Sequence, residues 1–404
     1  MLSPQLLWKK MNLVKSIYWA LILLLFIGTI SCQSGTQKKE TKNPTQNSSQ
    51  DLAFYHPTHI KYAKGFDIKI LDNGLKELIV WDPWNEGKIF QKYYLKNRGE
   101  NTNIQVPADG LLVEVPVRSI AALSSTQIGI LKFLNVQDRI VAVSLRDRIY
   151  DEDLNKKAQE GTIQAVGHAE SLNFEKIVEL DPELVMVAGF MKITDRETKL
   201  MNAGLPVAYN IEWMETSPLA RAEWAKFIAA FFNKEAEAEN LFNALEHRYN
   251  DLKKLVEHVE SKPSILSGYN FKGTWYMPGG QSYLAQFLRD GKADYCWFSD
   301  STSGSMPLSF EVVFDKQSEA DIWFGPGQCR TLEDMKALDS RYSLFKSYKN
   351  GQVYCYTKRM KESGANDWYE LGVMQPDVVF KDVIKILHPE LLPNYELHYY
   401  QQLK

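Results

Sequence analysis

The sequence is poor in cysteine and has no excess of positive charge. Its 404 residues include four cysteines, with no Cys-x-x-Cys pair and no Cys/His cluster, and this pattern disfavours a structural zinc site. The formal net charge is −3, and without residues 1–31, which carry three lysines and no acidic residue, it falls by three to −6. Because nucleic-acid binding requires a basic patch, the composition argues against that function.

The short motifs of common catalytic sites are also absent. The sequence contains no Gly-x-Ser-x-Gly, no His-Glu-x-x-His and no phosphate-binding loop. We therefore predict that the protein is not an enzyme and has no cofactor and no resident metal. In an oxidising compartment one disulfide can form among Cys296, Cys329 and Cys355, which leaves one thiol over.

Long apolar runs are missing except at the N-terminus. Leu21–Ile27 is apolar and follows three lysines, which predicts a signal peptide over residues 1–31 rather than a membrane span. Met11 is an alternative start. The stretch ending at Cys32 resembles a bacterial lipoprotein signal, with Thr29 in place of the usual Leu, and implies that Cys32 is lipidated. Conventional cleavage close to Cys32 is the alternative.

A polar stretch follows the signal peptide. Residues 32–50 are rich in Ser, Thr, Gln, Asn and Lys and contain no apolar run, so we predict a disordered tether. We expect the protein in the periplasm, lipid-anchored to the inner membrane. The outer membrane is the alternative.

One long amphipathic helix lies near the middle of the chain. Apolar residues from Leu241 to Val259 recur at spacings of three and four, and charged residues fill the other faces. With Asn233 as N-cap and Lys262-Pro263 as the stop, the pattern predicts a helix over residues 233–261.

Similar segments flank this helix. Two segments, Asn173–Val178 and Ser309–Phe314, share one pattern. Each begins with a helix-capping residue that is followed by Phe, Glu and a short helix, and each precedes an apolar strand that ends in Gly. A repeated unit on both sides of a long helix predicts an α/β protein of two doubly wound lobes, at residues 119–232 and 262–404.

The segment before the first lobe, residues 51–118, reads as β-rich. Gly65–Ile70 and Lys76–Val80 alternate apolar and polar residues around the turn Asp72-Asn73-Gly74. A third strand around Gln91–Leu95 completes the predicted sheet. The role of this segment is open.

From Ser119 onward, short apolar strands alternate with helices, which predicts parallel sheets covered on both faces. The predicted strands are Ile140–Val143, Leu184–Val187, Pro206–Tyr209, Ser264–Ser267, Asp321–Phe324 and Gln352–Tyr356. The predicted helices are Ser125–Leu134, Ile177–Leu180, Thr194–Ala203, Ser217–Phe232, Ser282–Leu288, Met335–Leu338 and Val378–Leu387.

Several stretches between Ser119 and His388 carry a family resemblance. They are Ala122–Thr126, Val136–Val143, Val166-Gly167, Asn173–Glu175, Asp181–Val185, Gly280–Ser282 and Leu308–Glu311. In their order and spacing the chain resembles the periplasmic binding proteins that serve ABC importers of iron–siderophore complexes, cobalamin and haem. The resemblance implies a monomer with two α/β lobes, one long connecting helix, ligand bound between the lobes, and an ABC permease with its ATPase as partners.

The same resemblance assigns a docking role to two acidic residues. In the family one Glu on each lobe contacts arginines of the permease, and the matching positions are Glu175 and Glu311. Each lies on a first helical turn, where the helix dipole also favours Glu. Their equivalent places in the repeat favour docking.

We expect ligand residues in loops that follow strand ends and face the cleft. The candidates are Arg146, Arg148, Tyr150 and Trp213 in the first lobe, and Tyr269, Trp275, Tyr276, Trp297, Arg359 and Trp368 in the second. Arg can pair with an anionic ligand, and Trp can cover a flat face. We expect His168 to be structural.

A ferric siderophore is the expected ligand, because it arrives fully chelated and needs no metal ligand from the protein. Cobalamin and haem are the alternatives. A surface-exposed binding lipoprotein that works without a permease is the competing function.

Overall fold

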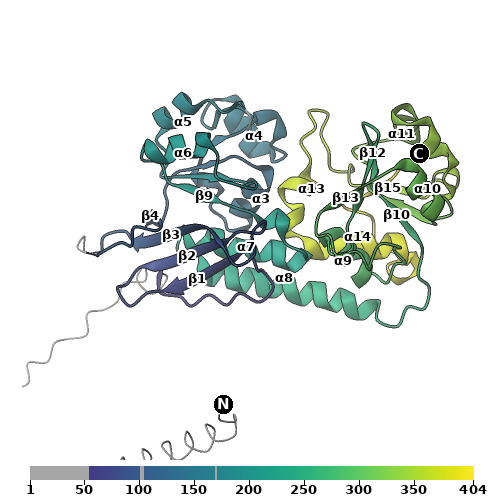
Figure 1. Ribbon diagram of the computed structural model, residues 1–404, viewed down its shortest axis with the longest axis horizontal. Coiled ribbons are helices and arrows are strands. Elements are labelled where there is room, and N and C mark those ends of the chain that lie inside the picture. The colour runs from purple at the N-terminus through teal and green to yellow at the C-terminus, as the bar shows by residue number, and fades with distance from the viewer. Residues whose placement is uncertain (1–53, 101–103, 169–170) are drawn as a thin grey trace, which may run out of the picture. The chain divides into compact units, whose positions relative to one another are not determined.

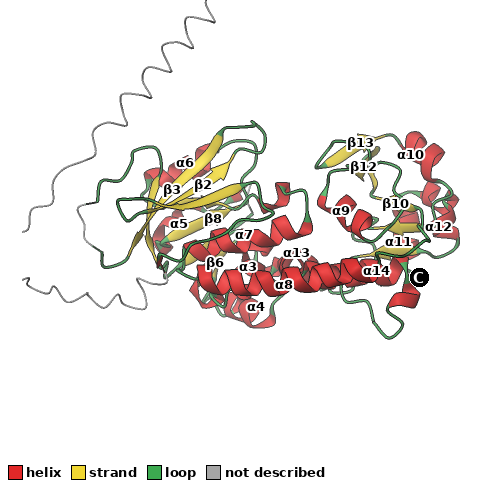
Figure 2. Cartoon of the chain, turned by 90° about the horizontal axis from the view of Figure 1, so that it is seen from below, coloured by secondary structure: helices red, strands yellow, loops and turns green. Residues whose placement is uncertain are grey.

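The computed structural model describes residues 54–100, 104–168 and 171–404. The predicted signal peptide, the lipidated Cys32 and the tether lie outside these residues. In the described part of the chain, no helix is both long and apolar enough to cross a membrane. Figures 1 and 2 show two lobes, one from each half of the chain, with helix α8 (Glu235–Leu255) running along both.

Lobe one is built on a five-stranded parallel sheet with strand order β7-β6-β5-β8-β9. Its strands are β5 (Ile120–Ala122), β6 (Ile140–Val143), β7 (Gln164–Ala165), β8 (Leu184–Val187) and β9 (Val207–Tyr209). Its helices are α3 (Ser125–Phe133), α4 (Glu152–Gln159), α5 (Phe174–Leu180), α6 (Asp195–Asn202) and α7 (Pro218–Ala230). Every residue of β8 is apolar and buried, as parallel strands covered on both faces require. The predicted parallel sheet is therefore confirmed here.

The β-rich N-terminal segment forms a sheet that packs on lobe one. It contains β1 (Phe66–Ile70), β2 (Lys76–Trp81), β3 (Ile89–Asn97) and β4 (Leu111–Val115). The first three strands are antiparallel, as predicted, and β4 joins β3 in parallel. Tyr93 accepts a hydrogen bond from the backbone N–H of Tyr209 at 3.0 Å, and Phe66 packs on Trp224. The segment thus shares the core of lobe one.

Buried carboxylates on lobe one hold the chain that leads into β1. Glu223 accepts hydrogen bonds from the backbone N–H groups of Lys61, Tyr62 and Ala63 at 2.6–2.8 Å. Its charge is further compensated by Lys226, whose ammonium lies 3.0 Å away and is also buried. One helix residue therefore fixes the bend at Lys61–Ala63 through charge-assisted hydrogen bonds.

Helix α8 joins the lobes and is shorter than predicted. It spans 21 residues with Lys234 as N-cap, because Asn233 adopts a left-handed conformation at φ 55° and so ends the preceding turn. The prediction of a cap at Asn233 and an end near residue 261 is corrected accordingly. The helix packs against α7 of lobe one and α14 (Pro376–Leu387) of lobe two.

Lobe two has a mixed sheet and a small second sheet. The main sheet has the order β10-β14-β15-β16, with the last strand antiparallel. Its strands are β10 (Ile265–Ser267), β14 (Ile322–Phe324), β15 (Val353–Cys355) and β16 (Gln401–Gln402). The second sheet is antiparallel and contains β11 (Tyr269–Phe271), β12 (Thr274–Pro278) and β13 (Ser305–Leu308). This second sheet is not among the predicted elements.

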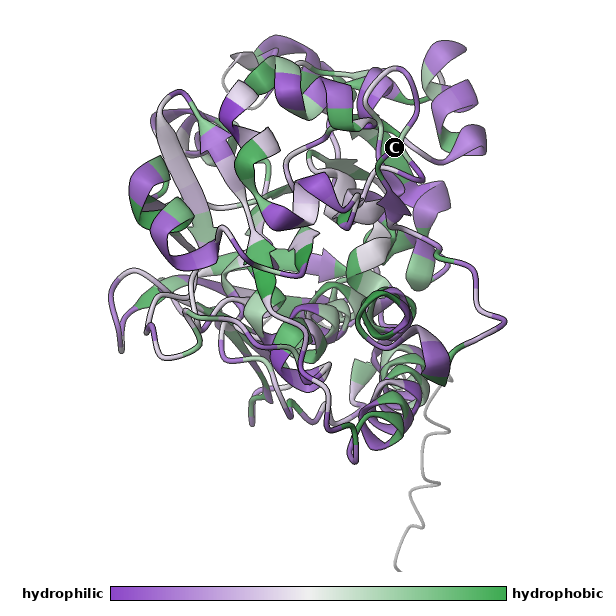
Figure 3. Cartoon of the chain, turned by 90° about the vertical axis from the view of Figure 1, so that its right-hand side faces the viewer, coloured by the Kyte–Doolittle hydropathy of each residue, from purple (hydrophilic) through white to green (hydrophobic). Residues whose placement is uncertain are grey.

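Helices surround the sheets of lobe two. They are α9 (Tyr283–Asp290), α10 (Phe310–Gln317), α11 (Leu332–Leu338), α12 (Lys346–Lys349) and α13 (Asp367–Glu370). Of these, α9 and α13 lie on the side that faces lobe one. Hydrophilic and hydrophobic residues alternate along helices in Figure 3, as in helices that pack on one side. Cys296, Cys329 and Cys355 are all unpaired, so the disulfide that the composition permits does not form.

We predict that Glu223→Gln destabilises the protein by roughly 1.5–3 kcal/mol, because it removes one of the two carboxylates that pair with the buried Lys226 and leaves three backbone N–H groups poorly satisfied. Urea unfolding measures the loss. Glu160→Gln is the matched control, since Glu160 lies exposed beside Lys156 and should change stability by less than about 1 kcal/mol. Equal, small effects of both variants would contradict the structural role of Glu223.

Candidate functional site

A cavity of about 640 Å³ lies between the two lobes. Its size falls in the range of small-molecule sites, and such sites often form between domains. Lobe one contributes Ser124, Thr126, Ala188, Glu212, Trp213 and Arg221. Among the lobe-two residues are Ser267, Tyr269, Tyr276, Ser282, Tyr283, Tyr356, Trp368, Tyr369 and Tyr400. The lining is therefore aromatic and rich in hydroxyl groups, and its described residues include one acidic and one basic side chain.

The lobe-two wall is a set of ordered rings. Tyr356 stacks on Trp368 with ring centroids 5.1 Å apart, and its hydroxyl lies 3.2 Å from that of Tyr369. Burial raises the pKa of both tyrosines. The two phenols are therefore neutral and can donate hydrogen bonds to oxygen atoms of a ligand.

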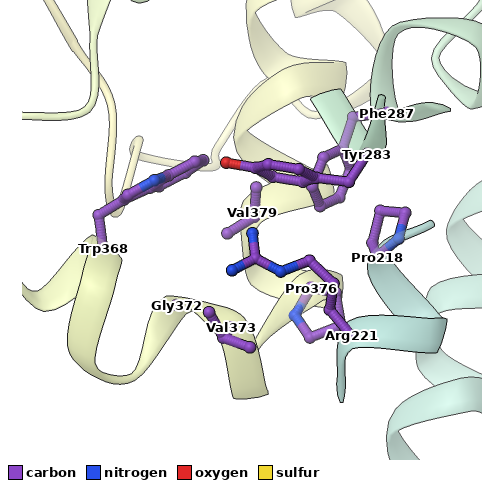
Figure 4. A pocket seen from close by; sticks show the side chains of 9 residues that line it. All are labelled: Pro218, Arg221, Tyr283, Phe287, Trp368, Gly372, Val373, Pro376 and Val379. Carbon is purple, nitrogen blue, oxygen red and sulfur yellow. The ribbon is translucent and has the colours of Figure 1, made fainter. Parts of the chain in front are cut away.

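Arg221 is the only basic residue in the cavity lining among the residues that the structure describes. Its guanidinium is 3.4 Å from Glu212 and lies over the ring of Tyr283 at 4.4 Å. Figure 4 shows it reaching from α7 towards Tyr283 and Val373 of lobe two. Among the described residues, Arg221 Nε and the second carboxylate oxygen of Glu212 are buried without hydrogen-bond partners. A buried donor without a partner is costly, so this guanidinium is suited to bind a ligand oxygen.

The start of α7 explains how Arg221 reaches the cavity. Ser217 caps the helix by accepting the N–H of Ala220, and Pro218 occupies its first turn, as predicted. Arg221 follows on that turn. Arg221 is not among the predicted ligand residues, because these were expected in loops after strands and Arg221 lies near a helix N-terminus. A signal was present, since Arg221 is one of few charged residues in the largely apolar stretch from Pro218 to Phe232.

Hydrogen bonds also tie the lobes together beside the cavity. The Glu370 carboxylate of lobe two accepts the backbone N–H groups of Tyr150 at 2.6 Å and Asp151 at 3.0 Å. Arg148 donates to the carbonyl of Gly364 at 3.2 Å. Burial raises the pKa of Glu370 to about 7. The contact between lobes is thus made largely by backbone groups of fixed position.

The structure brings four of the predicted ligand residues together in the cavity: Trp213, Tyr269, Tyr276 and Trp368. Arg148 lines a smaller neighbouring pocket of about 260 Å³, which shares Ser124, Thr126 and Tyr369 with the cavity.

The remaining predicted residues lie elsewhere. The guanidinium of Arg359 is paired with Asp367 at 2.7 Å and lies 5.2 Å from the centroid of the Tyr150 ring. Arg359 and Tyr150 therefore both contribute to the contact between the lobes. Arg146 is exposed beside Asp147. Neither Arg146 nor Arg359 is among the residues that line the cavity.

Two predicted tryptophans pack inside lobe two. Trp275 is fully buried, stacks on Trp323 and donates to the carbonyl of Ser267 at 2.9 Å. Its predicted place in the site is therefore corrected to the core. Trp297 packs against Tyr295 and does not line the cavity. A large aromatic side chain in a short strand can pack in the core as readily as it can contact a ligand.

Glu175 and Glu311 occupy equivalent exposed positions. Each follows a capping residue and a Phe at the start of its helix, α5 or α10. The side chain of Glu311 is 76% exposed, with Arg341 3.7 Å away. Both carboxylates are accessible to a partner.

Comparison with known proteins decides the family. The family model described as periplasmic binding protein matches residues 120–360. The chain belongs to the periplasmic binding protein family. The match runs from β5 to just beyond β15 and includes α8, whereas the N-terminal sheet of this periplasmic binding protein precedes it.

Relatives of this family member include two uncharacterized lipoproteins of Methanocaldococcus jannaschii. One is 28% identical, with 84% of each chain covered. The other is 25% identical over 95% of this chain and 99% of the relative.

Solved structures share the fold at low identity. An ABC-type Fe3+-hydroxamate transport system protein from Saccharomonospora viridis is 15% identical with a TM-score of 0.51, covering 67% of this chain and 93% of its own. A molybdate-bound periplasmic binding protein from Haemophilus influenzae is 15% identical with a TM-score of 0.51. The match covers 70% of this chain and 89% of the Haemophilus protein. No group of three or more His, Cys, Asp or Glu residues that could hold a metal ion occurs among the described residues.

Proposed function

We propose that this periplasmic binding protein is the substrate-binding component of an ABC importer and captures a ferric siderophore between its lobes. The observation that carries the proposal is the aromatic cavity with a single, incompletely paired guanidinium. A ferric siderophore supplies all oxygen ligands of its iron, so the protein has only to recognise the outside of the complex. Its similarity in fold to a protein of a ferric-hydroxamate transport system is consistent with this class of ligand.

Each part of the cavity suits such a complex. The guanidinium of Arg221 can donate to chelating oxygen atoms, which carry negative charge. The neutral phenols of Tyr356 and Tyr369 can donate further hydrogen bonds. Trp213 and Trp368 offer flat apolar faces to the ligand's rings or methylene groups.

We further propose that Cys32 carries a lipid anchor. The support is the signal-like sequence before it and the lipoprotein names of the two relatives. Mass spectrometry of the mature N-terminus tests this proposal, and an unmodified Cys32 would contradict it. Anchoring would keep the binding protein close to its permease.

Arg221→Gln should weaken the binding of ferrioxamine B about tenfold to a hundredfold, because a charge-assisted hydrogen bond contributes roughly 1.5–3 kcal/mol. Quenching of tryptophan fluorescence measures the affinity, and thermal unfolding verifies that the variant is folded. Arg139→Gln is the control, since Arg139 is exposed and paired with Asp138.

The same titration with cobalamin and haem separates the alternatives. Tight binding of either, with no binding of ferric complexes, would refute the siderophore assignment. Unchanged affinity in folded Arg221→Gln would remove Arg221 from the site.

Docking is proposed to use Glu175 and Glu311. The double variant Glu175→Lys/Glu311→Lys should abolish uptake through the reconstituted importer, because like charges would meet at the interface. Ligand affinity should not change, since neither residue lines the cavity.

The matched control for docking is Glu179→Lys/Glu319→Lys. It makes the same change of charge at exposed positions in or next to the same two helices. Normal uptake by the Glu175/Glu311 variant, or equal loss in the control, would rule out specific docking.

A further inference from the structure

An aromatic shelf adjoins the cavity on lobe one. It consists of Trp84, Phe190, Met191 and Trp213. Phe190 stacks on Trp213 with ring centroids 5.9 Å apart and planes at 18°. Trp84 lies 6.0 Å from each of these two rings. Three segments distant in sequence therefore converge on one set of rings.

Trp84 comes from the N-terminal sheet, in the loop between β2 and β3. The carboxylate of Asp82 accepts the backbone N–H groups of Trp84 at 2.9 Å and Asn85 at 3.0 Å. Trp84 also packs on Phe90, which meets the edge of Tyr209 on β9. The loop is thus held in place at both its backbone and its ring.

Phe190 and Met191 are presented by a strained turn after β8. Met191 has φ 56°, and the N–H of Lys192 donates to the carbonyl of Phe190 at 2.6 Å. Such tight turns with positive φ are uncommon for residues other than glycine, and they cluster at functional sites. Gly189 lets the turn approach closely, since an added Cβ would lie 3.0 Å from Tyr209.

The shelf is apolar and open to solvent. Phe190 is 63% exposed and Met191 57% exposed, which is unfavourable unless a partner covers them. Trp213 belongs both to the shelf and to the lining of the cavity. Because the two surfaces share a ring, an occupant of the cavity can continue onto the shelf.

We propose that the shelf binds a hydrocarbon arm of the ligand that extends out of the cavity, and that the N-terminal sheet supplies Trp84 for this purpose. This inference rests on the proposed function, because it assumes a chelate in the cavity. It names the ligand class more narrowly, as a chelate that carries an acyl chain. It also gives a role to a sheet that precedes the family match.

The test compares N-acetyl ferrioxamine B with N-octanoyl ferrioxamine B, which carry the same charge and differ only in the length of the acyl chain. The wild-type protein should bind the octanoyl form about tenfold more tightly, since burying a few methylene groups yields that factor. Trp84→Ala and Phe190→Ser should each reduce this preference severalfold and leave the binding of the N-acetyl form unchanged. Leu338→Ser is the control, because Leu338 is similarly exposed, at 62%, on lobe two.

A probe without a chelator separates the two proposals. The apolar dye N-phenyl-1-naphthylamine should bind the wild type and the Leu338→Ser control, and bind the shelf variants more weakly. If this pattern holds while neither ferric complex binds, the siderophore assignment fails and the shelf survives as an apolar site. Equal dye binding by all variants, or an octanoyl preference that both shelf variants retain, overturns the shelf. A dimer that dissociates in Trp84→Ala would show that a second copy covers it, and would also overturn the proposal.

Discussion

Buried charge on α7 is the constraint on which this structure depends. Glu223 and Lys226 lie inside the protein, and each is compensated in full. Three backbone N–H groups and the ammonium satisfy Glu223, while Lys226 also pairs with Glu239 and donates to the carbonyl of His59. Because uncompensated burial of a charge costs several kcal/mol, the chain before β1 cannot leave α7 without a large loss of stability. The N-terminal sheet is for this reason an integral part of lobe one.

Arg221 belongs to the same helix but is compensated only in part. Glu212 occupies one side of the guanidinium and the ring of Tyr283 another, while the buried Nε has no hydrogen-bond partner among the described residues. The helix therefore connects two roles. Its middle fixes the N-terminal segment, which places Trp84 beside Trp213, and its first turn aims a cation into the cavity. The contacts of Glu370 and Arg148 hold the opposite lobe close to this turn.

Much of the fold was predictable because it depends on local pattern. Period-two alternation identified β1 and β2, apolar runs identified β8 and β14, and caps such as Ser217 identified helix starts. The small sheet β11-β12-β13 was not predicted, since its short strands lack a clear alternation. The site was predictable only in part. Trp213 lies shortly after the end of β9, as the rule of loops at strand ends expects. Trp368 lies on helix α13, farther along the chain from β15. Arg221 depends on tertiary packing, and Trp84 on a sheet that the family resemblance did not cover.

We propose that an iron chelate sits in the cavity and is recognised from its outside. Anomalous diffraction at the iron edge, from crystals grown with a ferric siderophore, tests this claim most directly. The account predicts one iron peak inside the cavity, surrounded by siderophore oxygen atoms, with the guanidinium of Arg221 hydrogen-bonded to one of them. An iron peak outside the cavity, or iron coordinated directly by tyrosine or glutamate side chains, would contradict it.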